Sequence, residues 1–564
     1  MNEHSGTSLR ARLAYEPAPL KFGTSGRRGL VRHLTQLEVY LNALAEARYL
    51  QSLPAAGGGI AAGDDFFFAC DLRPSSTRLV SEEDGRGELA QTIAQAVADA
   101  GMKPVFLGAI PTPALASFAF RRGKGNIMVT GSHIPFDRNG YKTNTARGEL
   151  LKKDEAPIQQ LAEEVRARLY ARPFAESLFD ERGMFKAGSQ PLPVTDGRAA
   201  GEYIERYTGF FHGARIEDKR ILVYQHSAVG RDLLVELLRR FGAEVIPAGR
   251  SETFVPIDTE NIGSAELGQI QTLVKAAQDT HGPIDAVVST DGDSDRPLIL
   301  GVNQGRVEFF PGDLVGMVVA EFLGADAVVV PISCNDAVDR GALRNALQPK
   351  TRIGSPFVIA GMEQALAEGR KTVCGWEANG GFLTGSDIVR QGRILAALPT
   401  RDAFLPILSV LLSAAEQKVP VSALFDRLPR RFGRAALLRN FPRATSLKIL
   451  RRFSPAGEAV RQVNFAAGSD PGLSRLREEI TRFFGPSRGF DAPERVDYTD
   501  GVRVYFRGGD IAHIRPSGNA DELRIYAVAD TAERAAEIAR LGVAEPDGIL
   551  RSIEAAVAAD GPWA

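Results

Sequence analysis

Three aspartates at alternate positions give the clearest chemical signal in the chain. Asp291, Asp293 and Asp295 lie in the stretch VVSTDGDSDRP, residues 287–297. Carboxylates this close repel one another unless a cation joins them, and hard oxygen ligands of this kind suit Mg²⁺. The apolar run at 286–289 predicts a buried strand that delivers the three carboxylates into a tight loop. The stretch therefore predicts a magnesium site.

This loop has two alternative interpretations. An EF-hand beginning at Asp291 would need glycine at its sixth position and glutamate at its twelfth, but Arg296 and Val302 stand there. This pattern argues against calcium sensing of that kind. A solvated acidic turn without a metal is the remaining non-functional interpretation.

A serine follows a second short apolar run, in NIMVTGSHIPFDRNGYK at residues 126–142. The run at 127–129 predicts a buried strand, so Ser132 is expected where that strand opens into a loop, a common place for a nucleophile. The alternative is a loop serine that only bonds to nearby backbone. Turns are predicted at Gly131, Pro135 and the Asn139-Gly140 pair.

Two further stretches carry groups that suit phosphates and sugars. RPSGNADELR, residues 515–524, combines arginines with hydroxyl, amide and glycine positions, which together can form a phosphate cradle; the alternative is a polar hairpin turn. In VCGWEANGGFL, Glu377 and Asn379 follow a buried strand and are flanked by glycines. A carboxylate and an amide there suit sugar hydroxyls.

The elements expected around these loops are those of an α/β protein, because short apolar strands alternate with helical patterns. GMKPVFLG at 101–108, GAEVIPAG at 242–249 and GADAVVVP at 324–331 each follow a helical pattern and a glycine stop. They indicate a repeated helix-to-strand step, with chance similarity as the alternative. Residues 423–500 are rich in arginine and lead into paired strands and a helix from Thr531, which predicts an α+β tail.

Composition limits the class of protein. A chain of 564 residues exceeds the size at which one core keeps growing, which predicts about three to five domains. The net charge of −1 gives no support to a cationic nucleic-acid surface. The N-terminus has no apolar signal region, and the apolar stretch 403–415 is too short to span a membrane.

Three widely separated cysteines, Cys70, Cys334 and Cys374, have no C-x-x-C spacing. This predicts reduced, mostly buried thiols. We therefore expect a soluble, cytoplasmic protein.

Together these stretches resemble the α-D-phosphohexomutase superfamily, over nearly the whole chain and in the family's order. KFGTSGRRG at 21–29 is similar to the family's opening FGTSGIRG, TGSHIP to its serine loop TASHNP, and DGDSDR to its metal loop DGDxDR. WEANGG is similar to the sugar loop GExSGH, and RPSGNADELR to the phosphate loop RPSGTEPxxR.

The resemblance implies four domains around a central cleft. These would be three related α/β domains, at 1–192 with the serine loop, 193–305 with the metal loop and 306–420 with the sugar loop, and a C-terminal α+β domain of the TATA-binding-protein-like type at 421–564. The partners implied are small-molecule sugar phosphates, with no nucleic acid and no membrane, and the chain would be a monomer or a homodimer.

The resemblance also implies a role for each loop. Ser132 would be the phosphoserine and would ligate Mg²⁺ together with Asp291, Asp293 and Asp295. The groups expected around the transferring phosphoryl group are Arg28, Lys142 and Arg296. Lys142 would act as general acid or base if neighbouring cations weaken its hold on the proton, with His133 as the alternate.

The remaining roles concern the substrate. Glu377 and Asn379 would orient the sugar. The non-reacting phosphate would be held by Arg515, Ser517, Gly518, Asn519 and Arg524. Phosphoserine would donate its group to a hexose 1- or 6-phosphate, and the hexose 1,6-bisphosphate formed would turn over and also serve as activator.

Departures from the family's pattern bear on the choice of sugar. Trp376, Asn379 and Gly381 stand where the family usually has glycine, serine and histidine. In the serine loop Gly131 and Ile134 replace alanine and asparagine, and in the phosphate loop Asn519, Ala520 and Asp521 replace threonine, glutamate and proline.

We expect a phosphomannomutase, or an enzyme with both phosphomannomutase and phosphoglucomutase activity. The reason is that the glycine-rich sugar loop is nearer to mannose/glucose enzymes than to glucose-only ones. Phosphoglucomutase and phosphoglucosamine mutase are the alternatives within the family. A sugar-phosphate-binding protein without turnover is the alternative from another class. The intact Ser132, the three aspartates, Arg28 and Lys142 count against it.

Overall fold

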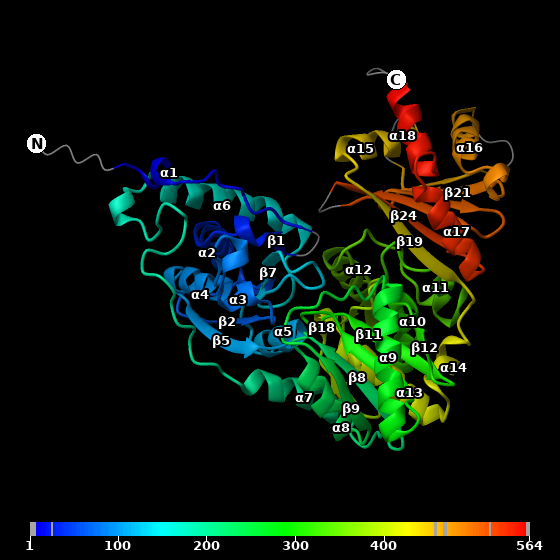
Figure 1. Cartoon of the computed structure of the whole chain (residues 1–564), viewed down its shortest axis with the longest axis horizontal. Coiled ribbons are helices and arrows are strands. Elements are labelled where there is room, and N and C mark those ends of the chain that lie inside the picture. Colours follow the sequence, from blue (N-terminus) through cyan, green and yellow to red (C-terminus); the bar gives the residue numbers. More distant parts are fainter. Residues whose placement is uncertain (1–6, 24–25, 456–459, 466–470, 518–520, 560–564) are drawn as a thin grey trace, which may run out of the picture. The chain divides into compact units, whose positions relative to one another are not determined.

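The chain forms two compact units in the computed structural model, which describes residues 7–23, 26–455, 460–465, 471–517 and 521–559 (Figure 1). The first unit contains residues 1–327 and 355–425, and the second contains 328–354 and 426–564. The division between them falls inside the short strand β13 (Ala327–Val329).

The first sheet of the first unit is built on an apolar strand that is buried on both faces. Its strand order is β1-β7-β6-β2-β5, and the strands are β1 (Arg27–Leu30), β2 (Asp65–Cys70), β5 (Lys103–Ala109), β6 (Asn126–Val129) and β7 (Arg138–Asn144). Strand β2 is parallel to β5 and β6, and the β6–β7 and β7–β1 pairs are antiparallel. Because side chains alternate along a strand, Phe66 and Phe68 join the core under helices α2 (Gln36–Ser52), α4 (Leu89–Asp99) and α6 (Lys152–Ala171). Phe67 points to the other face and packs on Phe118 of α5 (Thr112–Phe120).

The second sheet repeats the strand pairing of the first, except that its edge strand β12 comes last in the chain whereas β1 comes first. Its order is β12-β11-β10-β8-β9, and its strands are β8 (Arg220–His226), β9 (Glu244–Arg250), β10 (Ala286–Thr290), β11 (Pro297–Asn303) and β12 (Arg306–Phe309). Strand β8 is parallel to β9 and β10, whereas β10–β11 and β11–β12 are antiparallel. Helix α9 (Ser264–His281) packs its apolar face on this sheet (Figure 1). The repeated helix-to-strand step is therefore confirmed for these two sheets.

A third set of strands in the first unit is shorter. Strand β15 pairs antiparallel with both β14 and β18, and a separate two-stranded hairpin is formed by β16 and β17. The bounds are β14 (Val373–Trp376), β15 (Phe382–Thr384), β16 (Ile388–Arg390), β17 (Arg393–Leu395) and β18 (Leu398–Asp402). A small two-stranded ribbon, β3 (Leu79–Val80) with β4 (Arg86–Gly87), lies earlier in the chain.

The helices of the first unit connect these strands. Their bounds are α1 (Leu9–Arg12), α2 (Gln36–Ser52), α3 (Pro74–Thr77), α4 (Leu89–Asp99), α5 (Thr112–Phe120), α6 (Lys152–Ala171), α7 (Arg198–Phe210), α8 (Arg231–Arg240), α9 (Ser264–His281), α10 (Gly312–Leu323), α12 (Ser355–Ala367), α13 (Phe404–Gln417) and α14 (Val421–Phe425). Helix α2 begins where the Thr35 hydroxyl accepts the Glu38 N–H at 3.2 Å.

The predicted functional loops occupy one recurring place in this unit. The serine loop connects β6 to β7, the metal loop connects β10 to β11, and the sugar loop connects β14 to β15. Each connection joins two antiparallel neighbours, and each follows a fully buried strand. The repeated fold therefore presents one loop of each kind.

The predicted turn at Asn139-Gly140 is wrong, because both residues lie inside β7. The edge strand β1 pairs there, with Gly29 opposite Asn139 and Arg28 opposite Gly140. A Cβ on Gly140 would lie 1.9 Å from the Arg27 carbonyl oxygen, so the glycine permits the close approach of β1. Strand pairing has overruled the local turn preference.

The second unit contains a six-stranded sheet in the order β19-β24-β23-β22-β21-β20. Its strands are β19 (Phe432–Arg439), β20 (Gln462–Asn464), β21 (Pro493–Asp497), β22 (Val502–Phe506), β23 (Ile511–Pro516) and β24 (Glu522–Ala529). Its helices are α11 (Ala337–Arg340), α15 (Arg443–Arg452), α16 (Pro471–Phe483), α17 (Ala532–Val543) and α18 (Ile549–Ala559). All sheet pairs given by register are antiparallel, and Thr531 caps α17, which confirms the predicted α+β tail.

Two predictions from composition can be compared with the described residues. None of their helices is long and apolar enough to cross a membrane. Cys70, Cys334 and Cys374 are buried and form no disulfide within the described part of the chain, as predicted.

Candidate functional site

Ser132 lies in the connection between β6 and β7, and its side chain is fully buried. Its hydroxyl donates a hydrogen bond to Asp291 Oδ2 at 2.6 Å, and its backbone N–H donates to Thr130 Oγ1 at 2.7 Å. Its φ of +54° lies in the left-handed region, where a residue with a side chain costs about 1–3 kcal/mol and needs its surroundings to hold it. The serine is thus held directly against the first aspartate of the metal loop.

A buried arginine holds the serine loop in this shape. Arg73 follows β2 and its guanidinium donates to four main-chain carbonyl oxygens, those of Ser132, Ile134, Pro135 and Arg138. Its Cζ atom lies 3.9 Å from the ring centroid of Phe254. One side chain from a neighbouring strand therefore fixes most of the loop's backbone.

Asp71 completes this support. One of its oxygens, Oδ2, lies 3.3 Å from Arg73 Nε and accepts hydrogen bonds from the Thr130 hydroxyl at 2.8 Å and the Gly131 N–H at 3.3 Å. A Cβ at Gly131 would lie 2.5 Å from Arg73 Nε, so glycine leaves room for the guanidinium. Glycine therefore stands at this position, where the resembled motif has alanine, because the Arg73 guanidinium occupies the space of a methyl group.

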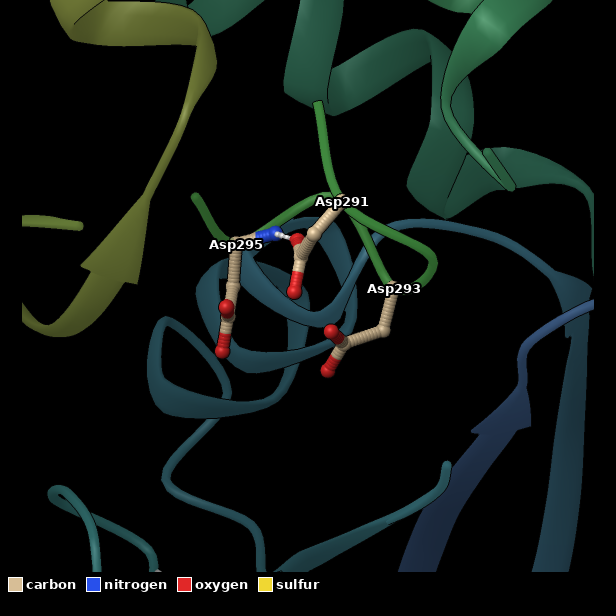
Figure 2. Close-up of side chains that lie close together, drawn as sticks. All are labelled: Asp291, Asp293 and Asp295. Atoms are coloured by element: carbon tan, nitrogen blue, oxygen red, sulfur yellow. Dashed lines mark hydrogen bonds between the residues drawn. The ribbon is translucent and has the colours of Figure 1, made fainter. Parts of the chain in front are cut away.

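The three aspartates of the metal loop converge, as Figure 2 shows. One oxygen atom from each of Asp291, Asp293 and Asp295 lies within 4.8 Å of the other two, and all three side chains are buried. The Asp295 N–H donates to Asp291 Oδ1 at 3.2 Å, which fixes the loop (Figure 2). Asp293 Oδ1 and Asp295 Oδ1 are buried without a hydrogen-bond partner. Buried carboxylate oxygens left in this way fit a hard divalent cation such as Mg²⁺.

Cationic side chains surround the same carboxylates. Lys142 Nζ lies 2.7 Å from Asp293 Oδ2 and 2.6 Å from Asp295 Oδ2. Arg401 Nη2 lies 3.0 Å from Asp295 Oδ2, and Arg296 Nε lies 3.7 Å from Asp295 Oδ1. The metal loop is therefore embedded in positive charge, which suits a site that receives a phosphoryl group.

These neighbours shift the aspartates in different directions. Burial, with the charges of Asp293 and Asp295, raises the pKa of Asp291 well above its usual range. Burial acts the same way on Asp293, but the ion pair and hydrogen bond from Lys142 outweigh it and hold its pKa below the usual range. Burial raises the pKa of Asp295 as well, but the charges of Arg401, Lys142 and Arg296 together outweigh it, so this pKa is also lowered. Asp293 and Asp295 therefore carry their charge at neutral pH.

Arg28 and His133 are half-buried beside these charges. Burial lowers the pKa of Arg28 to about 10, although Asp293 opposes the shift, so the guanidinium stays charged at neutral pH. Burial, with the charges of Arg296 and Arg28, lowers the pKa of His133 well below its ordinary value. Its Nδ1 lies 3.5 Å from Ser132 Oγ, so a neutral imidazole borders the serine.

The sugar loop brings Glu377 and Asn379 into the same unit, and both are nearly fully buried. Glu377 Oε2 accepts a hydrogen bond from Arg401 Nη1 at 2.9 Å. Asn379 Oδ1 accepts the Gly381 N–H at 2.9 Å, and its carbonyl oxygen accepts the Thr259 hydroxyl at 2.9 Å. The loop is tied both to β18 and to the segment before α9.

The predicted phosphate loop belongs to the second unit. Arg515 and Arg524 stand opposite each other on β23 and β24. Arg515 Nε lies 3.0 Å from Asp500 Oδ2, and Arg524 Nη2 lies 2.9 Å from Glu522 Oε2. Both guanidinium groups are therefore ordered by carboxylates at the end of the sheet.

Ser517 directly follows β23, and its N–H donates to the Glu522 carbonyl oxygen at 2.9 Å. Arg443, at the start of α15, donates to the Ser517 carbonyl oxygen at 3.0 Å and adds a third arginine to this end of the sheet. Gly518 and Asn519, which were also predicted to bind phosphate, lie outside the described residues.

Sequence reasoning missed four buried residues of the first unit that shape the site. Asp71 and Arg73 directly follow the apolar run of β2, and a charged pair at the carboxyl end of a buried strand was a usable signal. Arg401 has no such motif around it. The Thr112 hydroxyl, at the start of α5, donates to Asp293 Oδ2 at 2.7 Å and was also not foreseen.

Family models match three parts of the chain. A phosphoglucomutase/phosphomannomutase α/β/α domain I matches residues 19–169, domain III matches 311–432, and the C-terminal domain matches 458–541.

Curated relatives match almost the whole chain. A phosphomannomutase of Sinorhizobium fredii is 37% identical over 93% of this chain and 98% of its own length. A phosphomannomutase of Salmonella muenchen is 36% identical over 92% of this chain and 94% of its own. Among solved structures, a phosphoglucomutase/phosphomannomutase family protein of Burkholderia thailandensis is similar with a TM-score of 0.63 at 19% identity, covering 94% of this chain and 97% of the other.

Proposed function

Because this chain belongs to the phosphoglucomutase/phosphomannomutase family, we propose that it is a phosphomannomutase that interconverts mannose 6-phosphate and mannose 1-phosphate through a phosphoserine at Ser132. The choice of mannose is supported by the names of the two relatives that match over more than nine-tenths of the chain. Glucose phosphates are a second substrate class, since both sugars present the same phosphate positions.

The observation that carries the proposal is the 2.6 Å hydrogen bond from the Ser132 hydroxyl to Asp291 inside the cluster of three aspartates. A serine hydroxyl is a weak nucleophile in water, so a buried serine held against a carboxylate among cations is the arrangement that covalent catalysis needs. The cations Arg28, Lys142 and Arg296 would balance the charge of the phosphoryl group on its way to or from this oxygen.

The transfer balances with the chain's own groups. An oxygen of the hexose phosphate, from its 1- or 6-hydroxyl, forms the new P–O bond as the bond between phosphorus and Ser132 Oγ breaks. The hydroxyl proton leaves the sugar, and Ser132 Oγ gains a proton. We assign this proton movement to Lys142, with His133 as the alternate because its Nδ1 lies 3.5 Å from Ser132 Oγ. The hexose 1,6-bisphosphate formed then returns its other phosphate to the serine.

Asp291, Asp293 and Asp295, with Ser132, would hold Mg²⁺. When bound, the ion would neutralise charge on the phosphoryl oxygens. The two buried aspartate oxygens without hydrogen-bond partners support this assignment. Lys142, which pairs with Asp293 and Asp295, would keep these two carboxylates in place.

Substrate recognition divides between two loops in this proposal. Glu377 and Asn379 would orient the sugar hydroxyls, and the arginines Arg515 and Arg524 would hold whichever phosphate is not reacting, with Ser517. The sequence divides the chain into four proposed domains, with boundaries near 192, 305 and 420. Each proposed domain would contribute one of the four loops.

A substrate panel tests the proposal. Mannose, glucose, glucosamine and N-acetylglucosamine 1-phosphates would each be supplied with Mg²⁺ and the matching bisphosphate, and kcat/KM compared for the unmodified protein and Ser132→Ala. We expect turnover of the mannose and glucose compounds and loss of turnover in the variant. A strong preference for glucosamine 1-phosphate would overturn the substrate assignment, and turnover by Ser132→Ala would overturn the mechanism.

A further inference from the structure

Arg401 connects the metal loop to the sugar loop. It lies on β18, its side chain is 3% exposed, and its guanidinium meets carboxylates from both loops. Nε and Nη2 lie 3.1 and 3.0 Å from Asp295 Oδ2, and Nη1 lies 2.9 Å from Glu377 Oε2. A planar guanidinium fixes the direction as well as the distance of each partner.

The sugar loop makes room for this side chain at Gly381. A Cβ built there would lie 2.5 Å from Arg401 Cδ, 2.7 Å from Cγ and 3.0 Å from Cβ. These are atoms of the buried stem rather than of a free end, so they cannot easily give way. The glycine that departs from the resembled motif is therefore the position over which the Arg401 stem lies.

Arg401 also contacts the start of α12, beside a hydrogen-bonded group around Glu149. Nη1 lies 3.4 Å from Ser355 Oγ at the start of α12. The Ser355 hydroxyl donates to Glu149 Oε2 at 2.6 Å, and the Thr400 hydroxyl donates to Glu149 Oε1 at 2.7 Å. Contacts from three segments hold the arginine in one place.

From this geometry we infer that Arg401 is a positioning residue that sets the direction of the Glu377 carboxylate relative to the metal-loop carboxylate Asp295. The inference rests on the proposed function, because it takes Glu377 as the group that receives sugar hydroxyls. With Oε2 occupied by Arg401, Glu377 presents its other oxygen in a fixed direction. Arg401 acts on the sugar through Glu377, and the metal loop and sugar loop keep one relative placement.

A buried ion pair that only stabilises the fold would predict a different outcome. Its removal would lower stability and leave the affinity of the folded protein for sugar phosphate unchanged. Positioning through Glu377 instead predicts that Arg401 and Glu377 act as one unit, so that losing either has the effect of losing both.

The test measures equilibrium binding of mannose 6-phosphate by calorimetry, together with kcat, KM and Tm. The variants are Arg401→Ala, Arg401→Lys, Glu377→Gln and the double variant Arg401→Ala/Glu377→Gln. Gly381→Ala is a second route, since it keeps the charge of Arg401 and displaces its stem. Arg390→Ala is the matched control, because Arg390 pairs with Glu416 outside the site.

We expect Arg401→Ala and Glu377→Gln each to raise the Kd and KM for mannose 6-phosphate by about tenfold or more, the size expected for loss of a charge-assisted contact. The double variant should show about the effect of one substitution rather than the product of both. Arg401→Lys should recover part of the loss. Gly381→Ala should raise KM and also lower Tm, because its methyl group overpacks the buried Arg401 stem. Arg390→Ala should bind as the unmodified protein does.

Unchanged Kd in folded Arg401→Ala or Gly381→Ala, or independent effects of Arg401 and Glu377, would overturn the inference. If Arg401→Ala does not fold, Gly381→Ala and Arg401→Lys decide the question by the same measurements. Failure of the proposed function is a separate result, because the unmodified protein would then neither bind nor turn over any hexose phosphate in the panel.

Discussion

Replacing Arg73 with lysine should uncouple the serine loop while keeping a positive charge beside Asp71. The guanidinium donates to the carbonyl oxygens of residues 132 and 138 at 3.0 and 2.8 Å, to that of Pro135 at 2.7 Å, and to that of Ile134. An ammonium group has three donors at one point and cannot reach oxygens on both sides of the loop.

The magnitude follows from the bonds that lysine cannot replace. Losing two of the four charge-assisted bonds costs about 1.5 kcal/mol each, or about 3 kcal/mol together. This loss acts on a loop that also holds Ser132 at a φ of +54°. Since about 1.4 kcal/mol is a factor of ten, the productive loop conformation should fall about a hundredfold in population. We expect kcat to fall by that factor while KM changes little.

The assay is steady-state turnover of mannose 1-phosphate, with Tm measured to show that the variant is folded. Hydrogen exchange of the amides in residues 131–138 should increase in Arg73→Lys. Arg78→Lys, at an exposed position five residues further on, is the matched control and should behave as the unmodified protein does. A folded Arg73→Lys that keeps kcat within about threefold would show that Arg73 does not hold the serine loop in its productive shape. Loss of two charge-assisted hydrogen bonds should lower kcat by more than that.

Three further predictions concern the metal loop, the phosphate loop and pH. Asp293→Asn should lower kcat far more than it weakens sugar-phosphate binding, because it removes a charge expected to hold Mg²⁺. Arg515→Ala should raise KM for hexose 1-phosphate and hexose 6-phosphate by similar factors, on the order of ten- to a hundredfold. Burial lowers the pKa of His226 to about 4, so the unfolded chain binds this proton between pH 6.5 and 4 while the folded protein does not. Stability should therefore fall by about 3 kcal/mol as pH drops through that window, and His226→Gln should remove this part of the slope.

Each of these has an outcome that contradicts it. Near-normal turnover of Asp293→Asn in Mg²⁺ would remove the metal assignment. An Arg515→Ala variant that melts normally but impairs only one substrate would argue for separate phosphate sites. Denaturant unfolding at several pH values tests His226, with the exposed His212→Gln as control; an unchanged slope in His226→Gln would show that this histidine does not carry it.

The loops of the site could be predicted because each follows a short buried apolar run. The runs before Ser132 and Asp291 became β6 and β10, which hold the same place in two sheets with the same order of the other four strands beside a differently connected edge strand. Strand periodicity and residue type are local properties, so the sequence carries them directly.

The supporting arginine Arg401 could not be found in the same way. Arg401 lies 106 positions from Asp295 along the chain, and only the tertiary fold joins them. The turn predicted at residues 139–140 failed for a related reason, because pairing with β1 draws both residues into a strand. Long-range contacts decide these features, and local propensity does not encode them.

Trp376 departs from the family's sugar-loop motif, but this departure does not change the sugar site. Its side chain is fully buried and lies nearly parallel to Phe382, with ring centroids 6.0 Å apart. A Cβ at Gly316 would lie 2.3 Å from the indole ring, so α10 has made room for it. The tryptophan belongs to the core under the sugar loop rather than to the surface that meets a ligand.

The central claim, that Ser132 carries the phosphoryl group, is tested most directly by locating phosphate on the protein. The unmodified chain and Ser132→Ala would each be incubated with mannose 1,6-bisphosphate and Mg²⁺, and the modified residue identified by tandem mass spectrometry. We expect one acid-stable phosphate on Ser132 that is discharged when mannose 6-phosphate is added. Turnover without phosphate on Ser132, or phosphate that appears equally in Ser132→Ala, would contradict the mechanism.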